Sequence, residues 1–190
     1  WRLSAKKIDK VLCPTIATKN LLISKKIFSP EQVFFVPDPI INVKNINKLK
    51  KDNNLDIRFE KNNILLVGRL TKQKNFKLFV ESFEKIVAKF PNLKAFIIGH
   101  GELKSKINLQ IRNKKLSNNI FLLGYKKNTF NYMFNSKLFI LTSLWEDPGF
   151  VLIEAAYCNT TILSSDCESG PREFLGDREG GFLFKNNDKL

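Results

Sequence analysis

Residues 64–99 read ILLVGRLTKQKNFKLFVESFEKIVAKFPNLKAFIIG, two apolar runs separated by an amphipathic segment. The runs 64–67 and 95–98 do not alternate with polar residues, which is typical of strands that are covered on both faces. The segment between them predicts a helix that ends at Pro91, because its apolar residues recur at helical spacing. Those apolar residues are Phe76, Phe79, Val80, Phe83, Val87 and Phe90. The order strand, helix, strand indicates a parallel sheet.

The same pattern continues toward the C-terminus. Further apolar runs predict strands at residues 120–123, 138–141, 161–163 and 182–184. Helices are expected around Leu103, Ile107 and Ile111 and over residues 150–157, where Pro148 suits a first helical turn. We therefore expect an α/β fold, a Rossmann-like parallel sheet with helices on both faces.

Residues 1–60 follow a different pattern. Short strands are expected at 11–12 and 33–36, a helix at 15–27, and a loosely structured Lys/Asn-rich linker at 42–61. A chain of 190 residues fits one well-buried domain with a short appendage. We therefore place the main domain at residues 61–190. The start at Trp1 and the stop within a polar segment suggest an excised part of a longer protein, truncated at its C-terminus.

The composition is basic, with 32 Lys and Arg against 18 Asp and Glu and a formal net charge of +14. This excess suits a nucleotide, a nucleic acid or an anionic membrane surface, and equally a solvated face without a partner. Cys13, Cys158 and Cys167 are odd in number and outside any C-x-x-C spacing, so neither a disulfide framework nor a zinc site is indicated. No apolar run approaches the roughly 20 residues of a membrane span. We expect a cytoplasmic protein, with peripheral contact at the inner face of the plasma membrane left open.

Ligands of open parallel sheets bind at the carboxyl ends of the strands. There this sequence places Gly68-Arg69, Gly99-His100-Gly101, Gly124-Tyr125 and the stretches 143–146 and 164–166. Arg69 and Lys74 are close enough in sequence to converge on one anion, such as a diphosphate. Taken alone, two cations among 32 are commonplace, and glycine suits tight turns for steric reasons.

Two glutamates, Glu146 and Glu154, are separated by seven residues across an expected strand-to-helix junction. Both could face one cleft and accept hydrogen bonds from sugar and ribose hydroxyls, although acidic residues near a helix start are also ordinary dipole partners. The first backbone amides of the helix would be free to hold a phosphate. They belong to Gly149, Phe150, Val151 and Leu152.

In this order, the motifs between Val67 and Leu183 resemble the donor-binding domain of retaining GT-B glycosyltransferases of glycosyltransferase family 4. The resemblance covers roughly the last two thirds of the chain and rests on several motifs in sequence. These motifs are Val67-Gly68-Arg69-Leu70 with Lys74, Ile98-Gly99-His100-Gly101-Glu102-Leu103, Leu122-Leu123-Gly124-Tyr125, Ser143-Leu144-Trp145-Glu146, Glu154, and Ser165-Asp166-Cys167-Glu168-Ser169-Gly170-Pro171-Arg172-Glu173.

The resemblance implies that Arg69 and Lys74 bind the donor diphosphate, that Glu146 contacts the sugar, and that Glu154 holds the nucleotide ribose. The other residues that it assigns to donor binding are Gly68, Tyr125, Ser143, Gly149, Phe150, Val151 and Leu152, with a base-binding edge after Leu123. The sequence departs from the family pattern at His100, Asn159 and Thr161, outside the proposed phosphate clamp.

The activity implied by the resemblance is transfer of a hexosyl or N-acetylhexosaminyl group, with retention, from a UDP-linked sugar to a saccharide or lipid-linked acceptor. It would serve surface polysaccharide or oligosaccharide biosynthesis. No Asp-x-Asp pair is present, so neither a metal nor another cofactor is expected. Residues 1–60 would then be a connector and the last piece of an N-terminal acceptor domain. The chain alone would bind donor without turnover.

The sequence favours two other classes of protein less well than a glycosyltransferase. A basic α/β module that binds nucleotide or RNA is disfavoured, because the aromatic residues fall mainly at helix-core positions, and no nucleic-acid partner is expected. A nicotinamide-binding dehydrogenase needs Gly-x-Gly-x-x-Gly after the first strand, which Gly68-Arg69-Leu70-Thr71 does not supply. His100 is expected to be a solvated loop residue, because no second His or nearby Cys completes a metal site.

Overall fold

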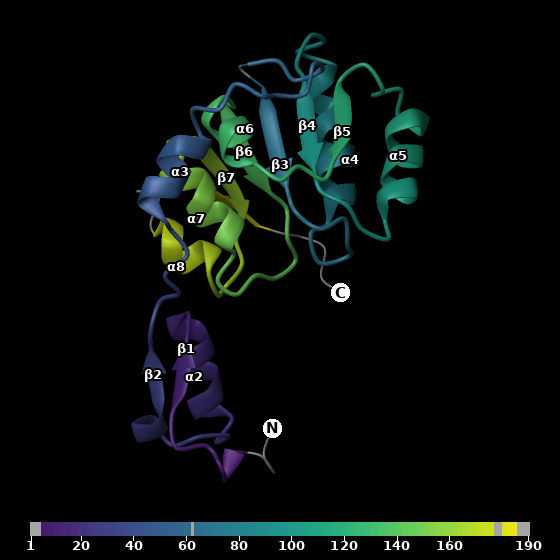
Figure 1. Cartoon of the computed structure of the whole chain (residues 1–190). Helices are drawn as coiled ribbons and strands as arrows, with labels where there is room; N and C mark the ends of the chain where they lie inside the picture. The colour runs from purple at the N-terminus through teal and green to yellow at the C-terminus, as the bar shows by residue number, and fades with distance from the viewer. Residues whose placement is uncertain (1–4, 62, 177–179, 186–190) are drawn as a thin grey trace.

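The computed structural model describes residues 5–61, 63–176 and 180–185, which form a two-stranded and a six-stranded sheet (Figure 1). The strands are β1 (Val11–Cys13), β2 (Val33–Phe35), β3 (Ile64–Val67), β4 (Ala95–Ile98), β5 (Ile120–Gly124), β6 (Leu138–Leu141), β7 (Thr161–Ser165) and β8 (Phe182–Phe184). The helices are α2 (Ile16–Ser24), α3 (Val43–Leu49), α4 (Phe76–Val87), α5 (Lys104–Asn113), α6 (Phe130–Phe134), α7 (Phe150–Tyr157) and α8 (Pro171–Leu175), with a 3-10 turn η1 (Pro30–Gln32).

The larger sheet has the strand order β5-β4-β3-β6-β7-β8, and every neighbouring pair is parallel. Strands buried on both faces need apolar residues at every position, which explains why these runs do not alternate. The predicted α/β fold with a parallel sheet is therefore confirmed.

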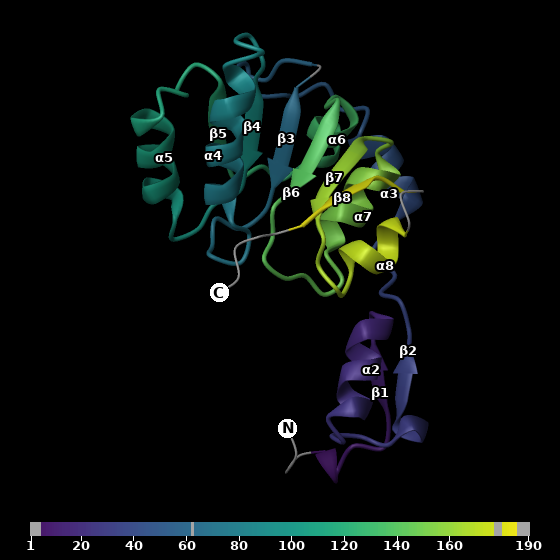
Figure 2. The same cartoon turned by 180° about the vertical axis from the view of Figure 1, so that it is seen from behind.

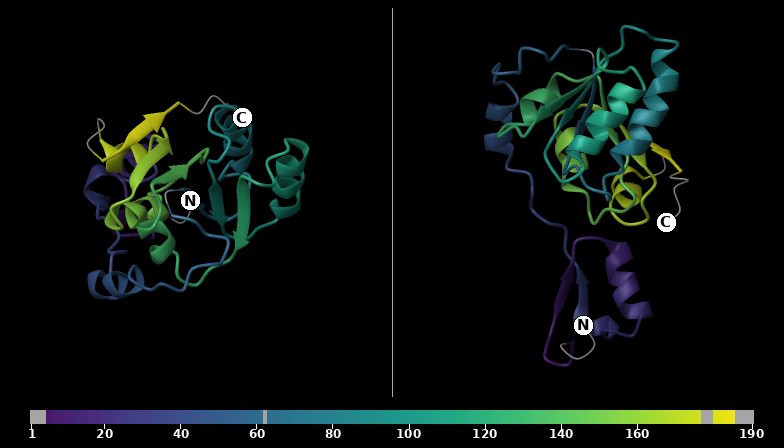
Figure 3. Two further views of the ribbon diagram at one scale, coloured as in Figure 1. Left: turned by 90° about the horizontal axis from the view of Figure 1, so that it is seen from above. Right: turned by 90° about the vertical axis from the view of Figure 1, so that its right-hand side faces the viewer.

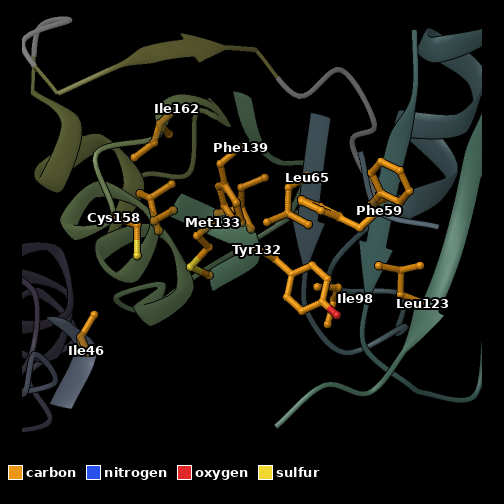
Figure 4. Close-up of a cluster of buried hydrophobic side chains, with 14 of the residues drawn as sticks. Ile46, Phe59, Leu65, Ile98, Leu123, Tyr132, Met133, Phe139, Cys158 and Ile162 are labelled. Atoms are coloured by element: carbon orange, nitrogen blue, oxygen red, sulfur yellow. The ribbon is translucent and has the colours of Figure 1, made fainter. Parts of the chain in front are cut away.

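Alternate residues of the central strands enter two separate cores. Leu65 and Phe96 belong to the cluster that includes residues of α3, α6 and α7 (Figure 4). Ile64 and Ile97 belong to the cluster formed with α4 and α5. Since successive side chains of a strand point to opposite faces, one sheet supports helices on both sides. Figure 3 shows this layered arrangement, as expected from the sequence.

A small lobe, defined here as β1, α2, η1 and β2, lies apart from the larger sheet (Figures 1 and 2). Its own core consists of Ala5, Cys13, Phe28 and Val33, with several partly buried neighbours. β1 and β2 pair in parallel, with Val11 opposite Val33. This lobe is too small to bury much apolar surface, so its position depends on contacts with the rest of the chain.

The expectation of a loose linker at 42–61 is wrong for much of that stretch. Residues 43–49 form α3, where the Asn42 side chain accepts a hydrogen bond from the amide of Asn45 at 3.0 Å. Ile46 is 2% exposed and packs in the same core as Phe59. A short helix that buries one side chain leaves little periodic signal among Lys and Asn, so composition alone misjudged it.

The other differences lie at element boundaries. α4 ends at Val87, before Phe90, and two short helices, α6 and α8, were not predicted. Pro148 does not occupy a first helical turn, because α7 begins after an N-cap at Gly149. Gly149 has a φ of 89°, a left-handed conformation that glycine adopts at little cost.

The packing of α3 on the larger sheet can be tested with a cavity substitution. We expect Ile46→Ala to lower the free energy of unfolding by about 3 kcal/mol, because a buried branched side chain leaves a cavity. Val43→Ala, on the exposed side of the same helix, is the matched control and should change it by well under about 1 kcal/mol. Urea denaturation measures both. Equal small effects would mean that α3 does not pack on the core in solution.

Candidate functional site

The larger sheet has a switch point between β3 and β6. From β3 the chain moves outward through β4 and β5, and from β6 it moves outward in the other direction through β7 and β8. Crevices at such points, beyond the carboxyl ends of the strands, are where open α/β sheets bind ligands. Gly68 and Arg69 follow β3, and residues 142–146 follow β6.

A buried ion pair bridges this switch point. The Lys74 ammonium lies 2.5 Å from Glu146 Oε1, and the two side chains are 13% and 5% exposed. The Ser143 hydroxyl, fully buried, donates to the same Oε1 at 2.5 Å. A buried carboxylate requires such partners, because desolvation of an unpaired charge costs several kcal/mol. The structure therefore brings together Lys74, Ser143 and Glu146, as a shared site requires.

Backbone contacts hold the two loops in register. The Leu144 amide donates to the Gln73 carbonyl at 2.8 Å, and Gln73 Nε2 donates to the Trp145 carbonyl at 2.9 Å. The Thr142 hydroxyl donates to the Lys74 carbonyl at 2.8 Å. Sequence reasoning missed Gln73 and Thr142, and no motif in the sequence marks them. They fix the backbone from which Lys74 reaches Glu146.

The loops after β3 and β4 approach each other too closely for a side chain. A Cβ on Gly99 would lie 1.9 Å from the Gly68 carbonyl oxygen. The Gly68 amide in turn donates a hydrogen bond of 3.0 Å to the Ile98 carbonyl. Next to this contact, His100 is exposed, as expected, and its ring meets Tyr125 edge to face with centroids 6.1 Å apart. Glycine at 99 is therefore a steric requirement of the site's wall.

The loop before α7 is held by a neighbouring turn. The Ser169 hydroxyl donates to the Glu146 carbonyl at 2.5 Å, and a Cβ on Gly170 would lie 2.0 Å from the Pro148 carbonyl oxygen. The Leu152 amide donates to the Gly149 carbonyl at 2.9 Å, so the expectation of a free amide at Leu152 is wrong. The first turn of α7 closes on its N-cap, Gly149, and this hydrogen bond uses the Leu152 amide.

The amides of Phe150 and Val151 also lie in the first turn of α7. They have no hydrogen-bond acceptor within the described ranges. The positive end of the helix adds a favourable field for an anion there.

The predicted side chains of Arg69, Tyr125 and Glu154 lie outside the cluster of Lys74, Ser143 and Glu146. Arg69 and Tyr125 are exposed, and among the described residues neither forms a hydrogen bond or ion pair with Glu146. Glu154 lies within α7 and is partly buried, and burial raises the pKa of its carboxyl above the ordinary value. Its carboxylate has no hydrogen bond or ion pair in the part of the chain that the structure describes. Unpaired polar groups at a sheet edge are available to a ligand.

A cleft of about 800 Å³ opens between the small lobe and the larger sheet. Its lining comprises Ile16, Ala17, Thr18, Asn20, Leu21 and Ser24 on one side and Leu144, Trp145, Glu146, Asp166, Cys167, Glu168, Ser169 and Glu173 on the other. Glu146 alone among the predicted site residues contributes to this lining, as far as the structure describes the chain. Arg172 donates two hydrogen bonds of 2.8 Å to Asp166 and holds the pKa of that carboxyl below its ordinary value.

Two carboxylates fasten the small lobe to the larger sheet at the start of α2. Asp147 accepts hydrogen bonds from the hydroxyls of Thr15 and Thr18, at 2.8 and 2.6 Å. Glu173 accepts from the amides of Ile16 and Ala17, at 2.8 and 2.7 Å. Acidic groups at a helix start satisfy its unpaired amides and complement its dipole. Because the partners lie more than 120 residues apart, no local pattern could predict this contact.

No group of three or more His, Cys, Asp or Glu side chains suited to a metal ion occurs in the described ranges. Among the described helices, none combines the length and apolar character that crossing a bilayer needs. All three cysteines are buried thiols without a disulfide, as expected from their number and spacing.

The contact at α2 generates a prediction about local stability. We expect Glu173→Gln to speed hydrogen exchange of the Ile16 and Ala17 amides by about fivefold, because a neutral amide is a weaker acceptor than a carboxylate. Glu168→Gln, an exposed neighbour in the same cleft, is the charge-matched control and should leave both rates unchanged. Exchange followed by NMR measures the effect. Unchanged rates in Glu173→Gln would show that the lobes are not joined there in solution.

Comparison with known proteins places this geometry in a family context. An uncharacterized glycosyltransferase of Methanocaldococcus jannaschii is 39% identical over 141 residues, covering 70% of this chain and 35% of that protein. A Campylobacter jejuni enzyme named as a diphospho-undecaprenol-linked 4-alpha-N-acetylgalactosaminyltransferase is 35% identical over 128 residues, covering 67% of this chain and 34% of the enzyme.

Among solved structures, a mutant of S. aureus TarM in complex with fondaparinux, alpha-GlcNAc-glycerol and UDP superimposes with a TM-score of 0.80. It is 28% identical and covers 97% of this chain and 35% of TarM. This chain therefore spans about a third of the length of each of these three proteins. The model of glycosyl transferases group 1 matches residues 16–190, and the chain belongs to this glycosyltransferase family.

Proposed function

We propose that this chain is the donor-binding part of a retaining glycosyltransferase that uses a UDP-linked sugar. The observation that carries the proposal is the Lys74–Glu146 contact across the switch point, in a chain that belongs to the group 1 family. The UDP held in the TarM complex supports uracil as the base. The name of the C. jejuni relative supports an N-acetylhexosaminyl group.

The diphosphate would be bound by cations and helix amides. Lys74 lies at the switch point, the exposed Arg69 guanidinium stands at the end of β3, and the amides of Phe150 and Val151 lie at the positive end of α7. Together they would neutralise the charge of the leaving group without a metal ion. We therefore propose that the transfer does not depend on a metal ion.

Glu146 would contact the transferred sugar with its second oxygen. Lys74 and Ser143 both contact Oε1, and within the described residues no hydrogen bond involves Oε2. That oxygen is therefore available to accept a hydrogen bond from a sugar hydroxyl. A Cβ on Gly149 would lie 3.7 Å from Oε2, at ordinary van der Waals contact, so glycine leaves that side of the oxygen uncovered.

The transfer step forms one bond and breaks one bond at the anomeric carbon. An acceptor hydroxyl attacks this carbon as the bond to the β-phosphate oxygen breaks, through an oxocarbenium-like state stabilised by the departing diphosphate. For retention, attack occurs on the face from which the diphosphate leaves, so the diphosphate can accept the hydroxyl proton. No protein nucleophile is assigned.

The nucleoside would extend from the diphosphate toward Glu154 and Tyr125. Glu154 has an unpaired carboxylate suited to the two ribose hydroxyls, and Tyr125, 70% exposed after β5, offers a ring and a hydroxyl near the base. Gly68 would allow close approach of the backbone to the ligand. These roles follow the family resemblance residue by residue.

The acceptor would enter the cleft between the small lobe and the larger sheet. We propose that the small lobe is the last piece of an acceptor-binding domain and that the acceptor is a saccharide or a lipid-linked saccharide. The net charge of +14 suits peripheral contact with an anionic membrane at its cytoplasmic face, where a lipid-linked acceptor would lie.

Calorimetric titration with UDP and GDP tests the donor site. We expect the wild-type chain to bind UDP in preference to GDP, with an affinity that EDTA does not change. Arg69→Ala and Glu154→Ala should each weaken UDP binding by about tenfold or more, because each removes hydrogen bonds to charged groups. Arg112→Ala, an exposed arginine on α5, is the matched control and should bind normally.

The opposite results would contradict separate parts of this proposal. Preference for GDP would overturn the base, and loss of affinity in EDTA would overturn metal independence. If circular dichroism confirms the fold and the chain binds neither nucleotide, the proposal that this chain alone forms the donor site is overturned.

A second prediction separates a functional from a structural role of Glu154. Because burial raises the pKa of Glu154, ionising this carboxyl costs the folded chain stability. The stability contributed by the protonated carboxyl is present at low pH and is lost as the pH rises through the folded pKa. We expect Glu154→Gln to raise the Tm at pH 7, with the difference shrinking toward pH 4, while UDP affinity falls. A lower Tm at pH 7 with unchanged affinity would instead indicate a structural glutamate.

A further inference from the structure

A second pocket lies between α4 and α5, which pack side by side (Figure 2). Its volume is about 390 Å³, within the range of sites for small molecules. The lining residues are Thr71, Lys72, Asn75, Phe76, Lys77, Leu103, Lys106, Ile107, Gln110 and Leu144. Neither Lys74 nor Glu146 lines it, so it is distinct from the proposed donor site.

Four apolar side chains contribute to this pocket. Phe76 and Ile107 are each 4% exposed, and Leu103 and Leu144 are partly buried. Together they offer an apolar surface on which a ring or a short hydrocarbon could lie. Inorganic ions alone would gain nothing from such a surface.

One buried polar atom in this pocket lacks a partner. Thr71 Oγ1 is buried and makes no hydrogen bond within the described residues. A hydroxyl can donate one hydrogen bond and accept two, and leaving it unpaired costs about 1–3 kcal/mol. Nearby, Gln110 Nε2 donates to the Lys77 carbonyl at 3.3 Å. An unpaired hydroxyl beside an apolar surface indicates a place where a ligand could supply the missing bond.

Positive charge surrounds the same opening. Lys72, Lys77 and Lys106 are exposed, and Lys77 has one acidic neighbour, Glu81, at 3.8 Å. No acidic side chain is part of the lining. α4 also begins here, after its N-cap at Asn75, so the positive end of its dipole adds to the field. The charge complements a phosphate group.

We propose that this pocket binds a small organic phosphate, with its apolar part on Phe76 and Ile107 and its phosphate between the lysines and the Thr71 hydroxyl. An occupant would touch the loop that holds Lys74, because Lys72 and Asn75 line the pocket together with Leu144, whose amide donates to the Gln73 carbonyl. The site therefore suits an effector that steadies this loop. Binding there does not depend on the proposed transferase activity.

Phenyl phosphate is a suitable probe, because it combines an apolar ring with a phosphate. In calorimetric titration of the whole chain, we expect it to bind more tightly than inorganic phosphate or phenol. Lys106→Gln and Thr71→Val should each weaken binding by about fivefold, through loss of a charge or a hydroxyl. Thr71→Val also removes a buried unpaired group, so it should keep its thermal stability.

Two controls separate this pocket from other basic surface. Lys104→Gln lies on the same helix outside the lining, and Arg69→Ala removes a cation of the proposed donor site. Both should bind phenyl phosphate as the wild type does. The proposal is overturned if phenyl phosphate does not bind, if inorganic phosphate binds equally well, or if either control weakens binding as much as Lys106→Gln. If the chain bound phenyl phosphate as expected but did not bind UDP, the proposed donor site would be wrong and the proposal for this pocket would stand.

Discussion

The buried pair of Lys74 and Glu146 is the constraint around which the larger unit is arranged. A carboxylate that is 5% exposed needs a cation, and this one comes from across the switch point of the sheet. The requirement ties the loop after β3 to the loop after β6, and Gln73 and Thr142 hold the backbones in that register. The strands, the tight glycine contacts and the first turn of α7 all serve to place these two charges. An anionic ligand bound at the proposed donor site would compete with Glu146 for Lys74 and would thereby reorganise this pair.

Much of this arrangement follows from local sequence. Apolar runs of four residues, with an amphipathic segment between them, specify β3, α4 and β4, because strand and helix periods differ and each run must be covered on both faces. The bounds of α7 also follow from the sequence. Glu146 and Lys74 were singled out by their place near the ends of predicted strands and by the family resemblance, but their direct contact with each other was not predicted.

Other parts depend on contacts that no window of sequence contains. Helix α3 packs on the core through Ile46 although the neighbouring residues are mostly Lys and Asn. Tertiary packing of this one side chain stabilises a helix that its own sequence only weakly favours. The unpaired hydroxyl of Thr71 becomes visible only when α5 packs beside α4. Each of these is a tertiary outcome.

The attachment of the small lobe has a mechanical consequence. Asp147 comes from the loop before α7 and Glu173 from α8, and together they hold the start of α2 through side-chain hydroxyls and backbone amides. Two anchor points on one turn oppose twisting about the helix axis as well as separation. Any movement of the lobe that opened or narrowed the cleft would therefore have to pivot about these bonds or break them. One of the two contacts that hold the lobe therefore belongs to the same loop that carries Glu146.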